Sequence, residues 1–173
     1  MNIGEGAAFA LVERRGTPRA MLLGVGESSD AYHPSSPHPE GRGALAAMEH
    51  ALRQGGLAAK DVDYVNAHGI GTKHNDSAES QAVEALLGRE VPVVSTKGYT
   101  GHTLGACGAV EAIFGIVSLE EGFLPASVGS TPRDPEILIH VPSERLSLHP
   151  RYVLSNSFAF GGNNCSVLLG RPE

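Results

Sequence analysis

The segment from Leu104 to Leu119 constrains the fold most, because it is apolar along almost its whole length. Glu111 is its only charged residue, and the other positions are small or aliphatic apart from Phe114. A helix that is apolar all round has to be covered on all sides, and this one is shorter than the ~20 residues that cross a bilayer. We therefore expect a helix between two layers of sheet, covered in part by structure outside these 173 residues.

Strand-then-helix units precede this segment and predict an α/β fold. Asp63 to Ala67 has the pattern of a strand, and a helix is expected to start at Asp76, with Glu79 completing a capping box. Val91 to Ser95 is almost wholly apolar, as parallel strands buried on both faces usually are.

The two ends of the chain have antiparallel strand patterns. Residues 6–13 and 20–26, separated by a turn, predict one antiparallel pair. The proline-rich stretch 33–39 predicts a surface loop, residues 42–54 a helix, and residues 152–169 two strands joined by a glycine-rich turn.

Composition excludes several classes of protein. The net charge of −6 argues against a nucleic-acid surface, and no apolar run is long enough for a membrane span. The N-terminal residues lack the pattern of a signal peptide, and two cysteines in small-residue surroundings do not suggest a disulfide framework. We expect a cytoplasmic protein without membrane or nucleic-acid partners.

Candidate catalytic residues follow the predicted strands. His68 and Lys97 each come just after a strand, and His102 lies at the start of the apolar helix. Ligands in open α/β sheets collect beyond the carboxyl ends of the strands, so we expect the three side chains at one rim. Neighbouring glycines would let a ligand approach the backbone closely.

Four sequence blocks in order resemble the β-ketoacyl-[acyl-carrier-protein] synthases of the FabF/FabB type. They are Asn66-Ala67-His68-Gly69-Ile70-Gly71-Thr72, Ser95-Thr96-Lys97, the run from Gly101 to Ala112, and the run from Asn156 to Asn164. The resemblance implies the C-terminal half of a thiolase-like fold, whose two halves stack as α-β-α-β-α layers, normally in a homodimer. It also implies that residues 1–26 are the last two strands of the N-terminal half and residues 27–173 the C-terminal domain.

The resemblance implies a decarboxylative Claisen condensation on acyl carrier protein. His68 and His102 would donate hydrogen bonds to the thioester oxygen, where preorganised donors are worth about 3 to 4 kcal/mol each. Lys97 would pair with Glu111, since an unpaired buried carboxylate is costly. The backbone N–H of Phe160 would be an oxyanion donor and its ring a gate. The nucleophilic cysteine would precede Met1, so the missing N-terminal half or a partner ketosynthase subunit would supply it.

The resemblance implies supporting roles for further residues. Phe158 and Asn164 would support the glycine-rich turn, and Ile70 and Thr72 would lie along the phosphopantetheine of the carrier protein, with no other cofactor and no metal. Four residues depart from the family's usual ones: Ile70 for threonine, Lys73 for proline, Ala159 for glycine and Asn163 for threonine. Cys107 and Cys165 are interpreted as packing residues, because burial raises the pKa of a thiol.

The sequence leaves three other functions open. A non-catalytic subunit like a chain-length factor would lack the nucleophile too, but such subunits tend to lose the histidines. A metal module would draw on five histidines, yet no metal-binding motif is present (His33, His38, His68, His74 and His102). A nucleotide-binding domain lacks its glycine-rich motifs.

Overall fold

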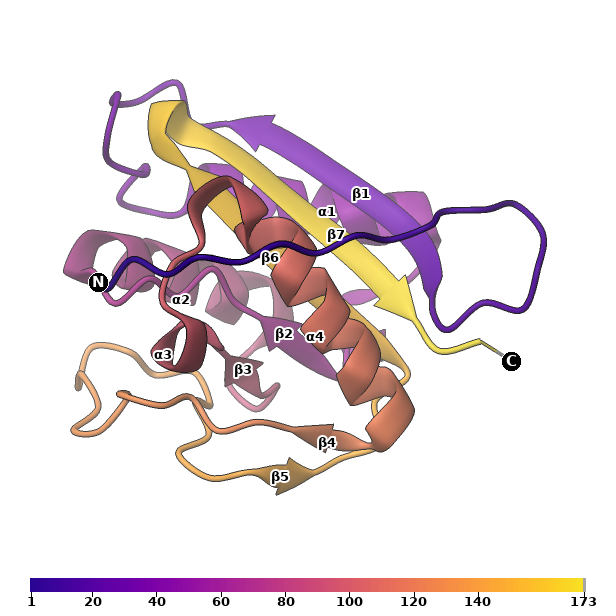
Figure 1. The fold of residues 1–173 in the computed structure, drawn as a ribbon. Helices are drawn as coiled ribbons and strands as arrows, with labels where there is room; N and C mark the ends of the chain where they lie inside the picture. The colour runs from indigo at the N-terminus through magenta and orange to yellow at the C-terminus, as the bar shows by residue number, and fades with distance from the viewer. Residues whose placement is uncertain (173) are drawn as a thin grey trace.

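The computed structural model describes residues 1–172 and has a five-stranded sheet as its centre (Figure 1). β2 is parallel to both of its neighbours, β6 and β3, whereas β7 is antiparallel to β6 and β1. The strands in spatial order are β1 (Met21–Ser29), β7 (Asn163–Gly170), β6 (Tyr152–Ala159), β2 (Tyr64–Asn66) and β3 (Val93–Val94). The predicted α/β class is confirmed.

Helices cover both faces of this sheet. α1 (Arg42–Gly55) and α2 (Lys73–Leu87) lie on one face, and α4 (Cys107–Glu121) lies across the other (Figure 1). Short elements complete the chain: η1 (Ala59–Asp61), α3 (Lys97–Thr100), η2 (Leu104–Ala106), the paired strands β4 (Phe123–Leu124) and β5 (Leu146–Ser147), and η3 (Phe160–Gly162).

Two hydrophobic clusters fill the space on either side of the sheet. Leu154 and Leu168 point toward α1 and α2, whereas their neighbours Val153 and Leu169 point toward α4. Successive side chains of a strand alternate between the two faces. The central strands therefore contribute to both clusters, as expected for strands buried on both faces.

The described chain covers α4 on one side. Gly115 lies against β6, and a Cβ atom added there would be 3.2 Å from Val153 Cγ1. On the opposite side Ala109 is exposed and Ile113, Phe114 and Val117 are only half-buried. The residues described thus provide one of the two layers that the apolar pattern requires.

The antiparallel pair expected between residues 6–13 and 20–26 is wrong. Residues 6–13 form no strand, and β1 pairs along its length with β7 instead. The N-terminal segment runs extended across α4 (Figure 1), with Phe9 92 % and Leu11 85 % exposed. A strand needs a hydrogen-bonded neighbour, and within residues 1–172 no strand runs beside residues 6–13. The division of the chain at residue 26 stays a prediction, although β1 shares a sheet with later strands.

The capping box expected at Asp76 is also wrong. α2 begins three residues earlier, at Lys73 after Thr72. The Asp76 carboxylate accepts hydrogen bonds from the backbone N–H groups of the loop before the helix, residues 70–72. These loop amides have no intrahelical partner. The Asp76 carboxylate therefore interacts with them and does not cap a helix that starts at Asp76.

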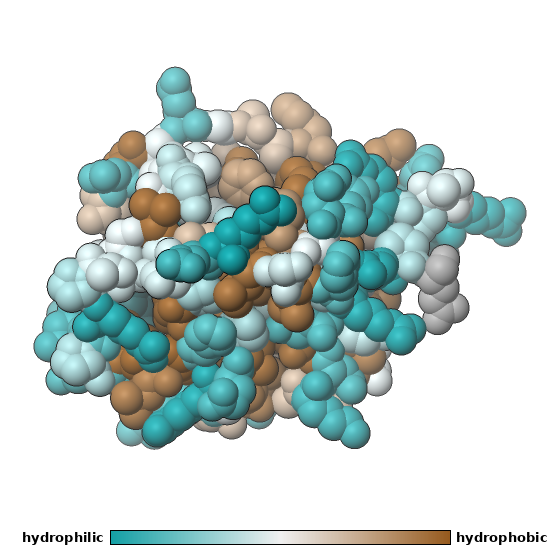
Figure 2. All heavy atoms as spheres, turned by 90° about the horizontal axis from the view of Figure 1, so that it is seen from below, coloured by the Kyte–Doolittle hydropathy of each residue, from teal (hydrophilic) through white to brown (hydrophobic). Residues whose placement is uncertain are grey.

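The surface shown in Figure 2 has apolar residues scattered among hydrophilic ones. Within residues 1–172, no helix is long and apolar enough to cross a membrane.

Candidate active site

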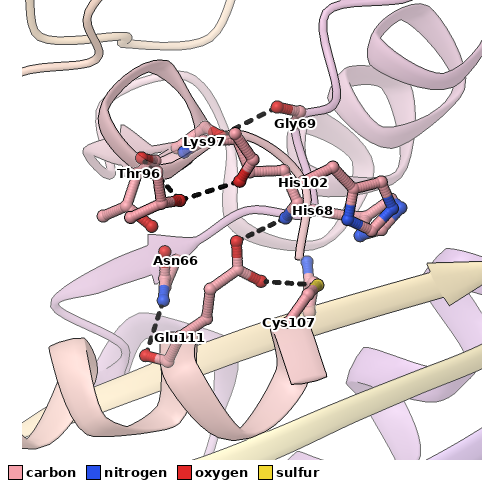
Figure 3. Close-up of polar contacts among 12 residues, drawn as sticks. Asn66, His68, Gly69, Thr96, Lys97, His102, Cys107 and Glu111 are labelled. Carbon is pink, nitrogen blue, oxygen red and sulfur yellow. Dashed lines mark hydrogen bonds and ion pairs between the residues drawn. The ribbon is translucent and has the colours of Figure 1, made fainter. Parts of the chain in front are cut away.

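The structure brings His68, Lys97 and His102 together at one end of the sheet (Figure 3). His68 follows β2, Lys97 begins α3 after β3, and His102 lies in the short link between α3 and η2. The two imidazole rings are 5.3 Å apart between centroids and nearly perpendicular, at 83°. The three side chains thus lie at one rim, as expected from their positions after the strands.

His68 is held in its neutral form by its surroundings. It is buried, at 4 % exposure, and its ring lies 5.8 Å from that of Phe158. Burial, and to a smaller extent the charges of Lys97 and His102, lower its pKa to about 3. Its Nδ1 has no hydrogen-bond partner within the described chain. A neutral imidazole can donate one N–H without carrying a charge.

His102 is more open, and its tautomer is set by the backbone. The N–H of Leu104 donates to His102 Nδ1 at 3.3 Å, so the proton of the neutral ring lies on Nε2. Partial burial, followed by the charge of Lys97, lowers its pKa. Its backbone is clipped to the N-terminal segment, with N–H to Asn2 O at 2.8 Å and O to Gly4 N at 3.0 Å. The free Nε2–H is available to a substrate oxygen.

Lys97 and Glu111 form the buried ion pair expected from the sequence. Lys97 Nζ donates to Glu111 Oε1, and the two side chains are 6 % and 3 % exposed. Burial raises the pKa of Glu111, and the Lys97 charge opposes this rise. Asn66 Nδ2 also donates to the backbone oxygen of Glu111 at 2.8 Å, which fastens α4 to β2.

Glu79 is a functional candidate that the sequence reasoning missed. Its buried carboxylate accepts the backbone N–H groups of His68 and Gly69, both at 2.8 Å, and Asn156 Nδ2 at 3.2 Å. Asn156 in turn accepts a hydrogen bond from Ser166 on β7. Burial raises the pKa of Glu79. The available signal was an acidic residue among the small residues Ala78, Ser80 and Ala82 of α2.

The glycine-rich turn η3 presents Phe160 to solvent, whereas Phe158 is part of the core. Phe160 is 75 % exposed and Phe158 9 %. Asn164 Nδ2 donates to Gly162 O and to Asp30 Oδ1, both at 3.1 Å. Asp30 N also donates to Gly162 O at 2.8 Å. Asp30, which the sequence reasoning did not single out, thus ties η3 to the loop after β1.

Ile70 and Thr72 occupy different environments. Ile70 lines a cavity of about 510 Å³ that also reaches Lys97 and His102. Thr72 instead precedes α2 as its N-cap residue and does not line this cavity.

Neither described cysteine has the environment of a nucleophile. Cys107 is 4 % exposed, and burial followed by the Glu111 charge raises its pKa to about 11. Burial also raises the pKa of Cys165. Among residues 1–172, no three His, Cys, Asp or Glu side chains are arranged to hold a metal ion, so the metal-module alternative gains no support.

The comparison with protein families decides the assignment of the chain. Residues 19–131 match the C-terminal domain of beta-ketoacyl synthases. The chain belongs to the β-ketoacyl synthase family. It is 38 % identical to 3-oxoacyl-[acyl-carrier-protein] synthase 2 of Coxiella burnetii over 98 % of this chain and 44 % of that protein. The Staphylococcus aureus synthase 2 is 37 % identical over 99 % of this chain and 44 % of its own length.

Solved ketosynthase structures have the same fold. The ketosynthase ApeO of Xenorhabdus doucetiae, solved with its chain length factor ApeC, is 46 % identical, with a TM-score of 0.84 over 91 % of this chain and 40 % of that chain. A beta-ketoacyl synthase of Burkholderia phymatum is 38 % identical in sequence, with a TM-score of 0.86. The match covers 91 % of this chain and 38 % of that chain. The predicted ketosynthase family and thiolase-like fold are therefore confirmed. The chain spans less than half the length of these relatives.

Proposed function

We propose that this chain supplies the His68, His102 and Lys97 part of a site for decarboxylative Claisen condensation of acyl and malonyl groups on acyl carrier protein. The observation that carries the proposal is the pair of imidazole rings, 5.3 Å apart. The environment lowers the pKa of both rings, that of His68 to about 3. Two neutral donors side by side suit an oxygen that gains negative charge during the reaction.

The proposed reaction uses this pair at the decarboxylation step. The carbon–carboxylate bond of the malonyl thioester breaks, CO₂ leaves, and the electron pair moves onto the thioester oxygen as an enolate. The N–H groups of His68 and His102 stabilise that oxygen by hydrogen bonding. The enolate carbon then attacks the acyl thioester on the nucleophilic cysteine, and the cysteine thiolate departs.

Lys97 and Phe160 have separate roles in this proposal. Lys97 adds to burial in keeping both imidazoles neutral, because burial and then its positive charge lower the pKa of His68 and of His102. Phe160, exposed on η3, provides a backbone N–H for the acyl carbonyl and a ring at the entrance of the acyl pocket. Glu111 supports Lys97, while Phe158 and Asn164 support His68 and η3.

Partner proteins are part of the proposed function. The substrates arrive on the phosphopantetheine of acyl carrier protein, near Ile70 and Thr72, and no other cofactor or metal takes part. The cysteine comes from the missing N-terminal half or from a partner ketosynthase subunit, and the full-length form is a cytoplasmic dimer. Solved relatives in complex with a chain length factor, and one with an acyl-carrier protein, support these kinds of partner. Because Cys107 and Cys165 lack the features of a nucleophile, this chain alone is expected to be inactive.

The second candidate is a non-catalytic subunit like a chain length factor. Structures that pair a ketosynthase with such a factor are among the similar ones, which gives this candidate its support. The neutral histidine pair favours the catalytic assignment, since a non-catalytic subunit has no need for two donors at one oxygen.

A reconstitution experiment separates the two candidates. The chain is combined with a ketosynthase N-terminal half whose nucleophilic cysteine has been replaced by a neutral residue, and CO₂ release from malonyl-carrier protein is measured. The catalytic assignment requires release, because decarboxylation needs donors at the thioester oxygen and no acyl-enzyme. Release no faster than that of the N-terminal half alone favours the non-catalytic subunit.

A further inference from the structure

Cys107 directly contacts the buried ion pair at the base of the site, although the proposed reaction does not use it. It is the first residue of α4 and lies one helical turn before Glu111. Its Sγ is 3.4 Å from Glu111 Oε2, with the thiol as donor and the carboxylate as acceptor (Figure 3). Side chains four residues apart on a helix are neighbours, so the contact follows from the sequence spacing.

The two oxygens of Glu111 are thereby divided between two donors. Oε1 accepts from Lys97 Nζ and Oε2 from Cys107 Sγ. Burial raises the pKa of Glu111, and the titratable groups that oppose this rise are Lys97 and Cys107. Both donors therefore favour the ionised form of the buried carboxylate, Lys97 more than Cys107, since an unsatisfied buried acceptor is costly.

The thiol itself keeps its proton. Burial, and then the neighbouring Glu111 charge, raise the pKa of Cys107 to about 11, against the weaker effect of Lys97. A thiol that stays protonated near neutral pH is a donor and not a nucleophile. At 4 % exposure Cys107 is also shielded from reagents in solvent.

We propose that Cys107 is a positioning residue, whose S–H bond to Glu111 Oε2 keeps that carboxylate ionised and aligned on Lys97. Lys97 is then fixed as a cation beside His68 and His102. The importance of this arrangement for condensation rests on the proposed function, whereas the contact and its effect on Glu111 do not. The competing explanation is that Cys107 only fills space at the start of α4.

Replacement of the thiol distinguishes a donor from a filler. Cys107→Ala removes the donor and leaves a gap, Cys107→Val removes the donor but keeps an apolar side chain of similar size, and Cys107→Ser keeps a donor. Cys165→Ala is the matched control, because Cys165 lies on β7 and does not contact Glu111. If packing alone matters, Glu111 should titrate as in the parent in the Cys107→Val variant but not in the Cys107→Ser variant.

The measurement is the titration of Glu111 in the complex of this chain with an unlabelled ketosynthase N-terminal half. It is followed by carbon-13 NMR of glutamate carboxyl groups labelled in this chain alone, with Glu111→Gln assigning the resonance. Cys107→Ala and Cys107→Val should each raise the midpoint by about 0.5 to 1 pH unit, the effect of one weak hydrogen bond to a charged group. Cys107→Ser and Cys165→Ala should titrate close to the parent. An unchanged midpoint in the Ala and Val variants, or a Ser variant shifted as far as they are, would overturn the proposal.

A second measurement covers the case in which acid unfolds a variant before Glu111 titrates. At one pH near neutrality, the ε-carbon resonance of Lys97 should move in the Ala and Val variants and stay in place in the Ser variant. The same resonance in all four chains would contradict the proposal. Neither measurement involves CO₂ release, so the proposed function can fail while this inference stands, and the reverse.

Discussion

His68 and His102 show how identical side chains acquire different properties from their surroundings. His68 is enclosed by Phe158, His102 and the end of β2, whereas His102 keeps an open Nε2 and uses Nδ1 to accept the Leu104 N–H. Burial, and then the charge of Lys97, lower the pKa of both. The pair therefore offers two donors without adding positive charge, and each donor can be tested by substitution.

Changing His68 or His102 to Ala should each slow CO₂ release by about 10²- to 10³-fold in the reconstituted site, the usual cost of one oxyanion donor. The double variant should lose less than the product of the two factors, because residues that act as a unit are not additive. His140→Ala is the control, because His140 is exposed and does not line the cavity at the site. If the His68 and His102 variants release CO₂ as fast as the parent, these histidines are structural.

The lowered pKa of His68 predicts how stability depends on pH. The folded protein takes up a proton at His68 only near pH 3, whereas an unfolded histidine does so near 6.5. Between these values the unfolded chain binds more protons, so this contribution to the free energy of unfolding falls as the pH is lowered through 6.5. At pH 5 the loss is roughly 2 kcal/mol. Urea unfolding of the parent and of His68→Gln at pH 7 and pH 5 measures it, and an equal change in both chains would contradict it.

At the scale of elements, the Lys97–Glu111 pair joins the start of α3 to the second turn of α4. Lys97→Ala should leave a buried carboxylate without its cation, which costs about 3 to 5 kcal/mol. Lys73→Ala is a matched control, because Lys73 forms an exposed pair with Glu136 at 3.8 Å and such pairs contribute at most about 1 kcal/mol. Urea midpoints measure both changes. Similar losses of unfolding free energy in the two variants would show that the buried pair stabilises the fold no more than the exposed pair does.

The sequence predicted those elements whose own pattern determines them. The central strands, α1 and the apolar α4 were all expected, as was the meeting of His68, Lys97 and His102, because each depends on a hydrophobic period or on a strand end. The errors fall where distant or absent partners decide the outcome. Residues 6–13 have a strand pattern but no neighbouring strand in the described chain. The Glu79 carboxylate accepts the backbone N–H groups of His68 and Gly69, which lie in a loop distant from it in sequence.

Asp30 illustrates why part of the site could not be predicted from the sequence. Its carboxylate meets Asn164 at 3.1 Å across a separation of 134 residues. No local period links two such positions, so only the folded chain reveals that the loop after β1 supports η3. The departures at Lys73 and Asn163 have visible contacts, since Lys73 pairs with Glu136 and Asn163 Nδ2 donates to Phe160 O at 3.3 Å.

At the scale of the whole molecule, the described chain leaves apolar surface uncovered in one region. The N-terminal segment crosses α4 (Figure 1). Its residues Phe9, Leu11 and Val12 are 92, 85 and 72 % exposed. The neighbouring side of α4 contributes half-buried Ile113 and Phe114. Exposed apolar surface of this kind favours association, and relatives of more than twice this chain's length have further structure available to cover it.

The isolated 173-residue chain should therefore self-associate or have a low melting temperature. A coexpressed ketosynthase N-terminal half should instead keep it in a discrete complex. Light scattering with a thermal melt measures both states. The double change Phe9→Ser and Leu11→Ser should shift the isolated chain toward monomer, because it removes the two most exposed large apolar side chains. Tyr32→Ser, which changes an exposed aromatic residue in the loop after β1, should leave the association unchanged. A monodisperse parent monomer with a cooperative, high melting temperature would show that this surface is stable in water, and that the half-covered α4 needs no second layer.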